Sequence, residues 1–195
     1  MRLANKIAIV TGAGQGIGAA ISSRFVAEGA HVIGIDRNDK SIAALAESLH
    51  NFTAFTADVQ DHYAIEQCIN QTIAQHGKID VLVNNAGFQY TVNFVESTLE
   101  QWQETQRVNL ESIYMLCKLV TPHMIDTGSG RIVNISSTQS IAAEPAVTAY
   151  ATSKGGINAF TRSLAVELAE YGILVNAIAP GCIHTPMSII NGVDE

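Results

Sequence analysis

The sequence predicts an α/β protein built on a doubly wound parallel β-sheet with helices on both faces. Two observations carry this prediction. Short apolar runs rich in Val and Ile recur along the chain, which is typical of strands buried on both faces of a parallel sheet. Longer stretches with helical spacing lie between them, and strict alternation of strand and helix indicates right-handed crossovers between parallel strands.

The expected strands, in chain order, are Ile7–Val10, Val32–Ile35, the weaker candidate Phe52–Phe55, Val81–Val83, Ile132–Ile135 and Val175–Ile178. The expected helices are Ile17–Glu28, Ser41–His50, Ile65–His76, Leu110–Asp126 and Ser153–Tyr171. Several strands are followed by Gly, Asn or Asp, which suits tight turns into helices. Ligands of such sheets bind at the carboxyl ends of the strands, so we expect the functional residues to lie there.

Composition narrows the class of protein further. The 195 residues predict one domain over residues 1–195, and the 47% of apolar and 15% of charged residues exclude intrinsic disorder. The net charge of −7 argues against a nucleic-acid partner. Cys68, Cys117 and Cys182 lack metal-binding spacing, which predicts free thiols in a reducing compartment, the cytoplasm. No apolar run reaches the ~18 residues of a membrane span, so we expect no membrane partner.

A glycine-rich loop, with Gly12, Gly14, Gly16 and Gly18, follows the first strand and opens the first helix. Glycine lets the backbone approach a ligand closely, and a helix N-terminus offers unpaired N–H groups to a phosphate. Asp36 ends the second strand, where a carboxylate can accept both hydroxyls of an adenosine ribose. These features predict a dinucleotide site; a tight turn without ligand, with Asp36 as a turn or cap residue, is the alternative.

Asp36 also bears on the choice of cofactor. A 2′-phosphate ~4 Å from a carboxylate would meet a repulsion on the order of 4 kcal/mol at an effective dielectric constant near 20. Arg37 could partly neutralise that phosphate, although a lone arginine is more often a solvated side chain. We therefore expect NAD rather than NADP.

Tyr150 and Lys154 are four residues apart, on one face of the last expected helix. A neighbouring ammonium favours the phenolate, so we expect Lys154, together with the positive charge of an oxidised nicotinamide, to bring the pKa of Tyr150 toward neutrality, where a tyrosine can act as general acid and base. Ser137 follows the fifth strand without a histidine placed to activate it, and its hydroxyl is predicted to polarise a carbonyl. Taken singly, the three residues are equally a core aromatic, a surface lysine and a loop serine.

These motifs together resemble the classical short-chain dehydrogenase/reductase family, in family order from about residue 10 to Pro186. The motifs are the glycine loop, Asn84-Asn85-Ala86-Gly87 after the fourth strand, Asn109 in Val108-Asn109-Leu110, the set Ser137, Tyr150 and Lys154, and Pro180-Gly181 followed by Thr185. The resemblance implies a Rossmann-like fold and hydride transfer between a nicotinamide and an alcohol or carbonyl carbon, with no metal.

The resemblance also assigns roles to residues. The catalytic residues that it implies are Asn109, Ser137, Tyr150 and Lys154. The implied cofactor-binding residues are Gly12, Gln15, Gly16, Ile17, Gly18, Asp36, Arg37, Asp58, Val59, Asn85, Ala86, Gly87, Tyr150, Lys154, Pro180, Gly181, Ile183 and Thr185. In the family, the asparagine matching Asn109 holds a water that links the lysine to solvent. Asn109 as a helix N-cap, Asp58 as a cap and Thr185 as a turn residue are the structural alternatives.

The expected function is NAD-dependent oxidation or reduction of a small polar substrate, such as a sugar, polyol, hydroxy or keto acid, or 3-oxoacyl compound. A non-catalytic NAD-binding or regulatory module is the alternative, and the glycine spacing disfavours a nucleotide-sugar epimerase. The family usually forms dimers or tetramers through the helices matching Leu110–Asp126 and Ser153–Tyr171, which implies a homo-oligomer. Family members continue with another helix and a seventh strand. This sequence lacks that C-terminal strand, so we expect the gene to extend past Glu195 and to cover the apolar edge at Val175–Ile178.

Overall fold

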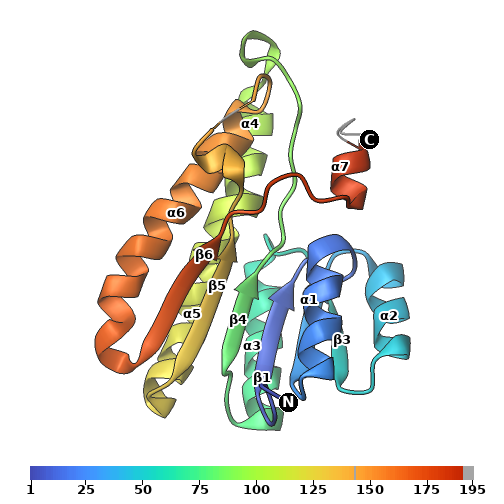
Figure 1. Cartoon of the computed structure of the whole chain (residues 1–195), viewed down its shortest axis with the longest axis vertical. Coiled ribbons are helices and arrows are strands. Elements are labelled where there is room, and N and C mark those ends of the chain that lie inside the picture. Colours follow the sequence, from blue (N-terminus) through green and yellow to red (C-terminus); the bar gives the residue numbers. More distant parts are fainter. Residues whose placement is uncertain (143, 191–195) are drawn as a thin grey trace.

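The computed structural model describes residues 1–142 and 144–190, and a parallel β-sheet forms its centre (Figure 1). The sheet has six strands in the order β3-β2-β1-β4-β5-β6. The strands are β1 (Ile7–Thr11), β2 (His31–Asp36), β3 (Phe52–Thr56), β4 (Val81–Asn84), β5 (Gly130–Ile135) and β6 (Ile173–Ile178). Every predicted strand is therefore present, and the predicted Rossmann-like class is confirmed.

Helices connect successive strands. They are α1 (Gly16–Ala27), α2 (Asp39–Ser48), α3 (His62–His76), α4 (Leu99–Gln106), α5 (Ser112–Thr127), α6 (Thr148–Leu168) and α7 (Pro186–Ile190). Short helical turns also occur: η1 (Phe94–Glu96), the π-helical η2 (Arg107–Glu111), η3 (Thr138–Ser140) and η4 (Ala169–Tyr171).

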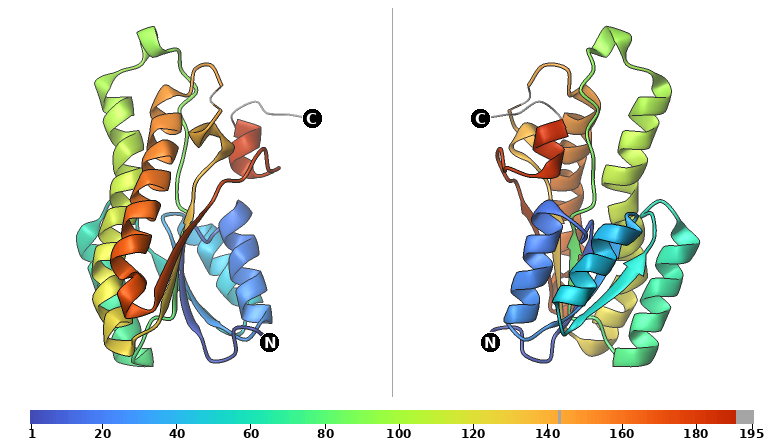
Figure 2. Two further views of the ribbon diagram at one scale, coloured as in Figure 1. Left: turned by 60° about the vertical axis from the view of Figure 1, so that its left-hand side comes forward. Right: turned by 90° about the vertical axis from the view of Figure 1, so that its right-hand side faces the viewer.

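The helices cover both faces of the sheet, as Figure 2 shows. Alternate residues of one strand enter different cores: Ile7 and Ile9 of β1 pack with α3, α5 and α6, whereas Ala8 and Val10 pack with α1 and α2. This two-sided burial explains the continuous apolar runs from which the strands were predicted.

The prediction of burial on both faces is wrong for the two edge strands. In β3, only Phe52 is buried, and Thr53, Ala54 and Thr56 are exposed. In β6, alternation is visible at its start, and Ile178 at its end is 53% exposed. Helix α2 packs against β3 and α6 packs against β6, and the other face of each edge strand is left largely exposed.

Helix α4 is absent from the predicted elements. The predicted helix Leu110–Asp126 corresponds to the end of η2 and to α5. The α4 sequence LEQWQETQ is almost entirely polar, so it lacks the apolar periodicity that marks a helix. Its N-terminus is nevertheless fixed by a capping box, in which Thr98 and Gln101 exchange side-chain-to-backbone hydrogen bonds. The π-helical turn η2 then joins α4 to α5.

The strand order reverses between β1 and β4, because the chain crosses to the far side of β1 after β3. In a doubly wound sheet the connections on either side of such a point diverge, which leaves a crevice at the carboxyl ends of the strands. In Figure 1 these ends point upward, toward α4 and α7, and the N-terminus lies at the opposite end.

Candidate active site

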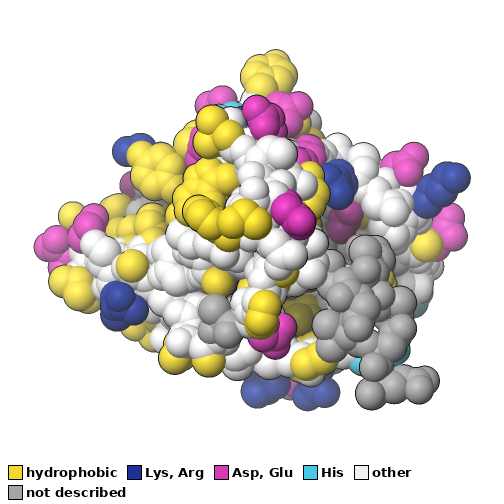
Figure 3. All heavy atoms as spheres, turned by 90° about the horizontal axis from the view of Figure 1, so that it is seen from above, with side chains coloured by type: hydrophobic (Ala, Val, Ile, Leu, Met, Phe, Trp, Pro, Cys, Tyr) yellow, Lys and Arg dark blue, Asp and Glu magenta, His cyan; other side chains and the backbone are white. Residues whose placement is uncertain are grey.

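A cleft of about 500 Å³ lies at the carboxyl ends of the strands. All of the predicted cofactor-binding residues line it except Gly18, and Ser137 lines it with Tyr150 and Lys154. Figure 3 views this end of the molecule from above, where hydrophobic side chains gather over part of the surface. The structure thus brings together motifs that lie far apart in the sequence.

The glycine loop requires glycine for two different reasons. Gly12 has a φ of +63°, and a Cβ there would lie 2.9 Å from the Ala86 Cα, so the backbone of the loop presses directly on the end of β4. Gly18 does not line the cleft: a Cβ on it would collide with the Gly12 carbonyl oxygen. Gly18 therefore allows α1 to pack closely under the loop.

The N-terminus of α1 faces the cleft through Gln15, Gly16 and Ile17. Gln15 occupies the N-cap position without a side-chain capping hydrogen bond, and the first turn carries no acidic residue. The first backbone N–H groups and the positive end of the helix dipole are thus available to an anion. This arrangement fits a pyrophosphate.

Asp36 closes the other side of the glycine loop. Its Oδ2 accepts a hydrogen bond from the backbone N–H of Gly14, and its Oδ1 accepts one from Asn38, both at 2.9 Å. Each carboxylate oxygen keeps a further lone pair for a ligand hydroxyl. Asp36 therefore orders the loop as well as presenting a carboxylate to the cleft.

Arg37 and Asp58 line the same end of the cleft and face one another. An Arg37 guanidinium nitrogen lies 3.9 Å from Asp58 Oδ2, with the arginine side chain 68% exposed. Asp58 also accepts a hydrogen bond from the backbone of Gln60, whereas Asp61 caps α3. An exposed pair at this separation contributes little stability, so both side chains are free to turn toward a ligand.

Asn85 ties the ends of β1 and β4 together. Its side-chain amide donates to the carbonyls of Thr11 (2.9 Å) and Gly12 (3.2 Å). The Thr11 hydroxyl in turn accepts backbone hydrogen bonds from Asn85 and Ala86. These bonds fix the floor of the cleft below the glycine loop.

Asn109 is fully buried in η2 and is not a helix N-cap. Its Oδ1 accepts from the backbone N–H of Phe88 at 3.0 Å, and its Nδ2 donates to the Phe88 carbonyl at 2.9 Å and to Ser153 Oγ at 3.1 Å. A Cβ on Gly87 would lie 3.2 Å from Asn109 Oδ1 and 3.6 Å from Lys154 Nζ. Asn109 is thus adjacent to Lys154 across Gly87, behind the wall of the cleft.

Tyr150 and Lys154 lie one turn apart on α6, as predicted. The Lys154 ammonium is 5.3 Å from the centre of the Tyr150 ring and donates a 2.8 Å hydrogen bond to the carbonyl of Ile135, at the end of β5. Ser137 is buried two residues beyond that carbonyl. Three of the four predicted catalytic side chains, those of Ser137, Tyr150 and Lys154, therefore meet where β5 ends against α6.

Burial controls the titration of both α6 residues. It lowers the pKa of Lys154 to about 8. It also raises the pKa of Tyr150 above its usual range, against a smaller lowering by the hydrogen bond with Ser137. Lys154 alone therefore does not bring the pKa of Tyr150 toward neutrality, because the cost of placing a phenolate away from water exceeds the effect of the neighbouring side chains.

The sequence does not predict which polar side chains pair in the loops near the cleft. Tyr90 donates a 2.6 Å hydrogen bond to Glu104 of α4, and Gln139 Nε2 donates a 3.2 Å bond to Glu144. Both pairs involve irregular segments, for which spacing in the sequence says little about proximity. The capping box of α4 is the one sequence signal that could have placed Glu104 on a helix.

The described residues carry two further results. No group of three His, Cys, Asp or Glu side chains among residues 1–142 and 144–190 is arranged to hold a metal ion. No helix in that part of the chain is long and apolar enough to cross a membrane.

Known proteins share both the sequence motifs and the fold. A family model for short-chain dehydrogenases matches residues 6–192. Oxidoreductase UcpA of Salmonella typhimurium is 42% identical over 192 residues, which cover 96% of this chain and 73% of that protein. The 2-(R)-hydroxypropyl-CoM dehydrogenase of Xanthobacter autotrophicus is 41% identical over 194 residues, which cover 94% of this chain and 77% of that protein.

Among solved structures, the 3-ketoacyl-(acyl-carrier-protein) reductase from Brucella melitensis complexed with NADH has a TM-score of 0.92 at 30% identity. That match covers 95% of this chain and 79% of the other. Fold and cleft together define an α/β oxidoreductase of the class that uses a nicotinamide cofactor. The chain belongs to the short-chain dehydrogenase family.

Proposed function

We propose that this protein is an NAD-dependent oxidoreductase that transfers a hydride between the nicotinamide and a secondary alcohol or carbonyl of a small, polar substrate. The observation that carries the proposal is that Ser137, Tyr150 and Lys154 lie at one end of a cleft whose other end carries Asp36. A proton-transferring group and a ribose-binding carboxylate in one cleft suit a dinucleotide that spans it.

The residues of the cleft divide into binding roles. The glycine loop and the N-terminus of α1 would hold the pyrophosphate, Asp36 the hydroxyls of the adenosine ribose, and Lys154 the nicotinamide ribose. Pro180, Gly181, Ile183 and Thr185 would line the nicotinamide end. When bound, NAD supplies the redox step by accepting or giving a hydride.

Proton transfer would belong to Tyr150. Its hydroxyl would take the alcohol proton during oxidation and return a proton to the substrate oxygen during reduction, while Ser137 donates a hydrogen bond to that oxygen. Because burial raises the pKa of Tyr150, release of its proton depends on positive charge nearby. The buried ammonium of Lys154 supplies such a charge from the adjacent turn of α6.

The Asp36 carboxylate supports NAD over NADP. A 2′-phosphate placed ~4 Å from it would meet a repulsion on the order of 4 kcal/mol at an effective dielectric constant near 20. Arg37 offsets this only partly, because its guanidinium is 68% exposed and its charge is therefore screened by water. The Brucella melitensis reductase, with the same fold, is complexed with NADH.

We also propose a homo-oligomer that uses α5 and α6. Tyr114 of α5 is 50% exposed and stacks edge to face on Phe160 of α6, with ring centres 6.4 Å apart. Val166 of α6 is 79% exposed. Apolar side chains gathered on two adjacent helices favour a subunit contact, and light scattering after size-exclusion chromatography would measure the mass.

The cysteines support a reducing compartment, and we propose the cytoplasm. Burial raises the pKa of both Cys68 and Cys117 to about 12, so these thiols stay protonated and unreactive at neutral pH. Cys182 is a free, exposed thiol. Thiol labelling of protein freshly isolated from cells would test whether all three are reduced.

The direct test of the proposed activity is a spectrophotometric assay of NADH formation with a panel of polyols, sugars and hydroxy acids, repeated with NADP. We expect turnover with at least one secondary alcohol and a preference for NAD of about 10-fold or more. NAD binding without turnover of any substrate would instead favour the non-catalytic NAD-binding module.

A further inference from the structure

The substrate end of the cleft has an uneven distribution of charge. Five charged side chains line the cleft in the described part of the chain: Asp36, Arg37, Asp58, Glu144 and Lys154. The first three lie at the ends of β2 and β3, far along the sheet from Tyr150. Lys154 is buried and engaged with the carbonyl of Ile135. Glu144 is therefore the one exposed charged group among the described residues beside Ser137 and Tyr150.

Hydrogen bonds connect Glu144 to Ser137. Ser137 lines the cleft with Tyr150, and its Oγ accepts the backbone N–H of Gln139 at 3.2 Å. The Gln139 side chain then donates to Glu144 Oε2 at 3.2 Å. The carboxylate is thus held on the same wall of the cleft as the serine that would bind the reacting oxygen.

Hydrogen bonds also connect this wall of the cleft to helix α6. The Ser140 hydroxyl donates to the Ser137 carbonyl at 2.6 Å and accepts from Asn158 Nδ2 of α6 at 2.7 Å. The turn η3 that carries Gln139 is therefore fixed to α6. A braced turn presents its polar groups in a constant geometry, which is what a specificity contact requires.

The wall offers a carboxylate acceptor rather than a cationic donor. The Glu144 side chain is exposed, whereas the Gln139 Oε1 atom is buried and cannot reach a substrate. No Lys, Arg or His of the described chain lines this end apart from the engaged Lys154. A substrate anion placed here would meet the negative charge of Glu144 with no facing cation to offset it.

We infer that the substrate is a neutral or cationic secondary alcohol that carries a second hydrogen-bond donor, a hydroxyl or an ammonium, on the carbon next to the reacting one. That donor binds Glu144, and the same carboxylate excludes substrates with a carboxylate at that position. The inference rests on the proposed function, and it makes Glu144 a specificity-determining residue.

Four alcohols with one skeleton test the inference: 1-aminopropan-2-ol, propane-1,2-diol, propan-2-ol and lactate. All share a CH(OH)CH₃ group and differ in the neighbouring substituent, which is cationic, neutral with a donor, apolar or anionic. We would measure kcat/KM for each with NAD, and each affinity by titration of the NAD-loaded Tyr150→Phe variant followed by NMR. We expect the amino alcohol and the diol to exceed lactate by roughly tenfold or more in both measurements.

Substitution of Glu144 isolates its contribution. In Glu144→Gln the advantage of the amino alcohol over lactate should fall to within about threefold, whereas Glu144→Asp should retain most of it. Glu47→Gln removes an equal charge from an exposed site on α2 and should leave the ratio unchanged. An unaltered ratio in Glu144→Gln, or an equal change in the Glu47 control, would overturn the inference.

The two measurements separate the possible failures. Binding in the expected order without turnover of any alcohol would contradict the proposed oxidoreductase activity and still support the role of Glu144. Turnover with lactate equal to or better than the diol would overturn the inference and support the activity. Absence of measurable binding for all four alcohols would also overturn the inference, since the site would then not recognise this group.

Discussion

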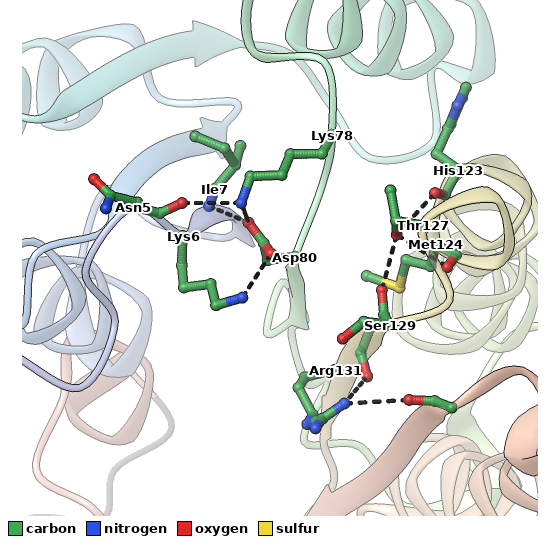
Figure 4. Close-up of polar contacts among 12 residues, drawn as sticks. Asn5, Lys6, Ile7, Lys78, Asp80, His123, Met124, Thr127, Ser129 and Arg131 are labelled. Atoms are coloured by element: carbon green, nitrogen blue, oxygen red, sulfur yellow. Dashed lines mark hydrogen bonds and ion pairs between the residues drawn. The ribbon is translucent and has the colours of Figure 1, made fainter.

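The two ends of the sheet treat charged side chains differently. At the amino ends of the strands, Asp80 accepts hydrogen bonds from Lys6, Lys78 and the backbone N–H of Ile7, each at 2.9 Å (Figure 4). At the carboxyl ends, the buried Lys154 has no carboxylate partner among the described residues and donates only to the Ile135 carbonyl. The partly buried charge at the amino ends is thus paired within the chain, whereas the buried charge at the carboxyl ends is not paired with an opposite charge among the described residues.

At the carboxyl ends of the strands, the protein retains a buried charge that lowers its free energy of unfolding. Burying a cation without a counter-charge destabilises the folded state, so such a residue is retained only where a ligand or a reaction uses it. A carboxylate held by two lysines and a backbone N–H carries no such cost. We therefore expect substitutions at the carboxyl ends to affect activity and those at the amino ends to affect stability.

Tyr150→Phe should show the largest effect. Removal of the hydroxyl eliminates the proposed acid and base, so kcat should fall by about 100- to 10,000-fold, while the affinity for NAD changes little. Steady-state kinetics and titration with NAD would measure the two quantities. Turnover within tenfold of the unsubstituted protein would assign proton transfer to another group.

Lys154→Met should abolish most activity and yet stabilise the protein at neutral pH. The pKa of Lys154 in the folded chain is about 8, below its ordinary value of 10.5. The penalty for burying the charge is therefore fully present below pH 8 and disappears as the pH rises past 10.5. We expect a gain of about 1–3 kcal/mol in the free energy of unfolding at pH 7, by urea denaturation.

The pH dependence supplies the control for that prediction. The difference in unfolding free energy between the Lys154→Met variant and the unsubstituted protein should shrink as the pH rises above 8 and approach zero above pH 10.5, because Lys154 is then uncharged in both the folded and the unfolded chain. A variant that is less stable at pH 7, or a gain that does not change with pH, would contradict the cost assigned to the buried ammonium.

Asp80→Asn should have the opposite profile, with a loss of stability and little loss of activity. Burial, the largest single influence, would raise the pKa of Asp80, but hydrogen bonds from Lys78, Ile7 and Lys6 together lower it. Its contribution is therefore present above the ordinary pKa and lost as the pH falls through the lowered one. We expect a loss of about 1–3 kcal/mol at pH 7 that diminishes near pH 3.

An exposed acid without such contacts controls for charge alone. Asp126→Asn on α5 should change the unfolding free energy by less than about 0.5 kcal/mol. If Asp80→Asn lowered kcat/KM by more than about threefold while its unfolding free energy stayed constant, the separation between the two ends would be wrong.

The comparison also shows what could be predicted from the sequence. The strands were predicted from apolar runs, and the pairing of Tyr150 and Lys154 was predicted from their spacing of four residues on a helix. Both are local properties of the sequence, so they do not depend on which distant segments come together. The polar helix α4 lacks the apolar periodicity of a helix and was missed. The effect of burial on the Tyr150 pKa could not be predicted because burial is a property of the fold, and the Gln139–Glu144 contact could not be predicted because side chains in an irregular segment meet only in three dimensions.

Amide hydrogen exchange with and without NAD tests the central claim most directly, because it needs neither a known substrate nor a substitution. NAD should slow exchange in the glycine loop from Gly12 to Gly18, at Asp36 and Arg37, and from Asn85 to Gly87. Exchange at the opposite end, from Lys78 to Asp80 and from Ser129 to Arg131, should stay unchanged. Equal protection at both ends, or protection confined to the amino ends, would contradict the central claim.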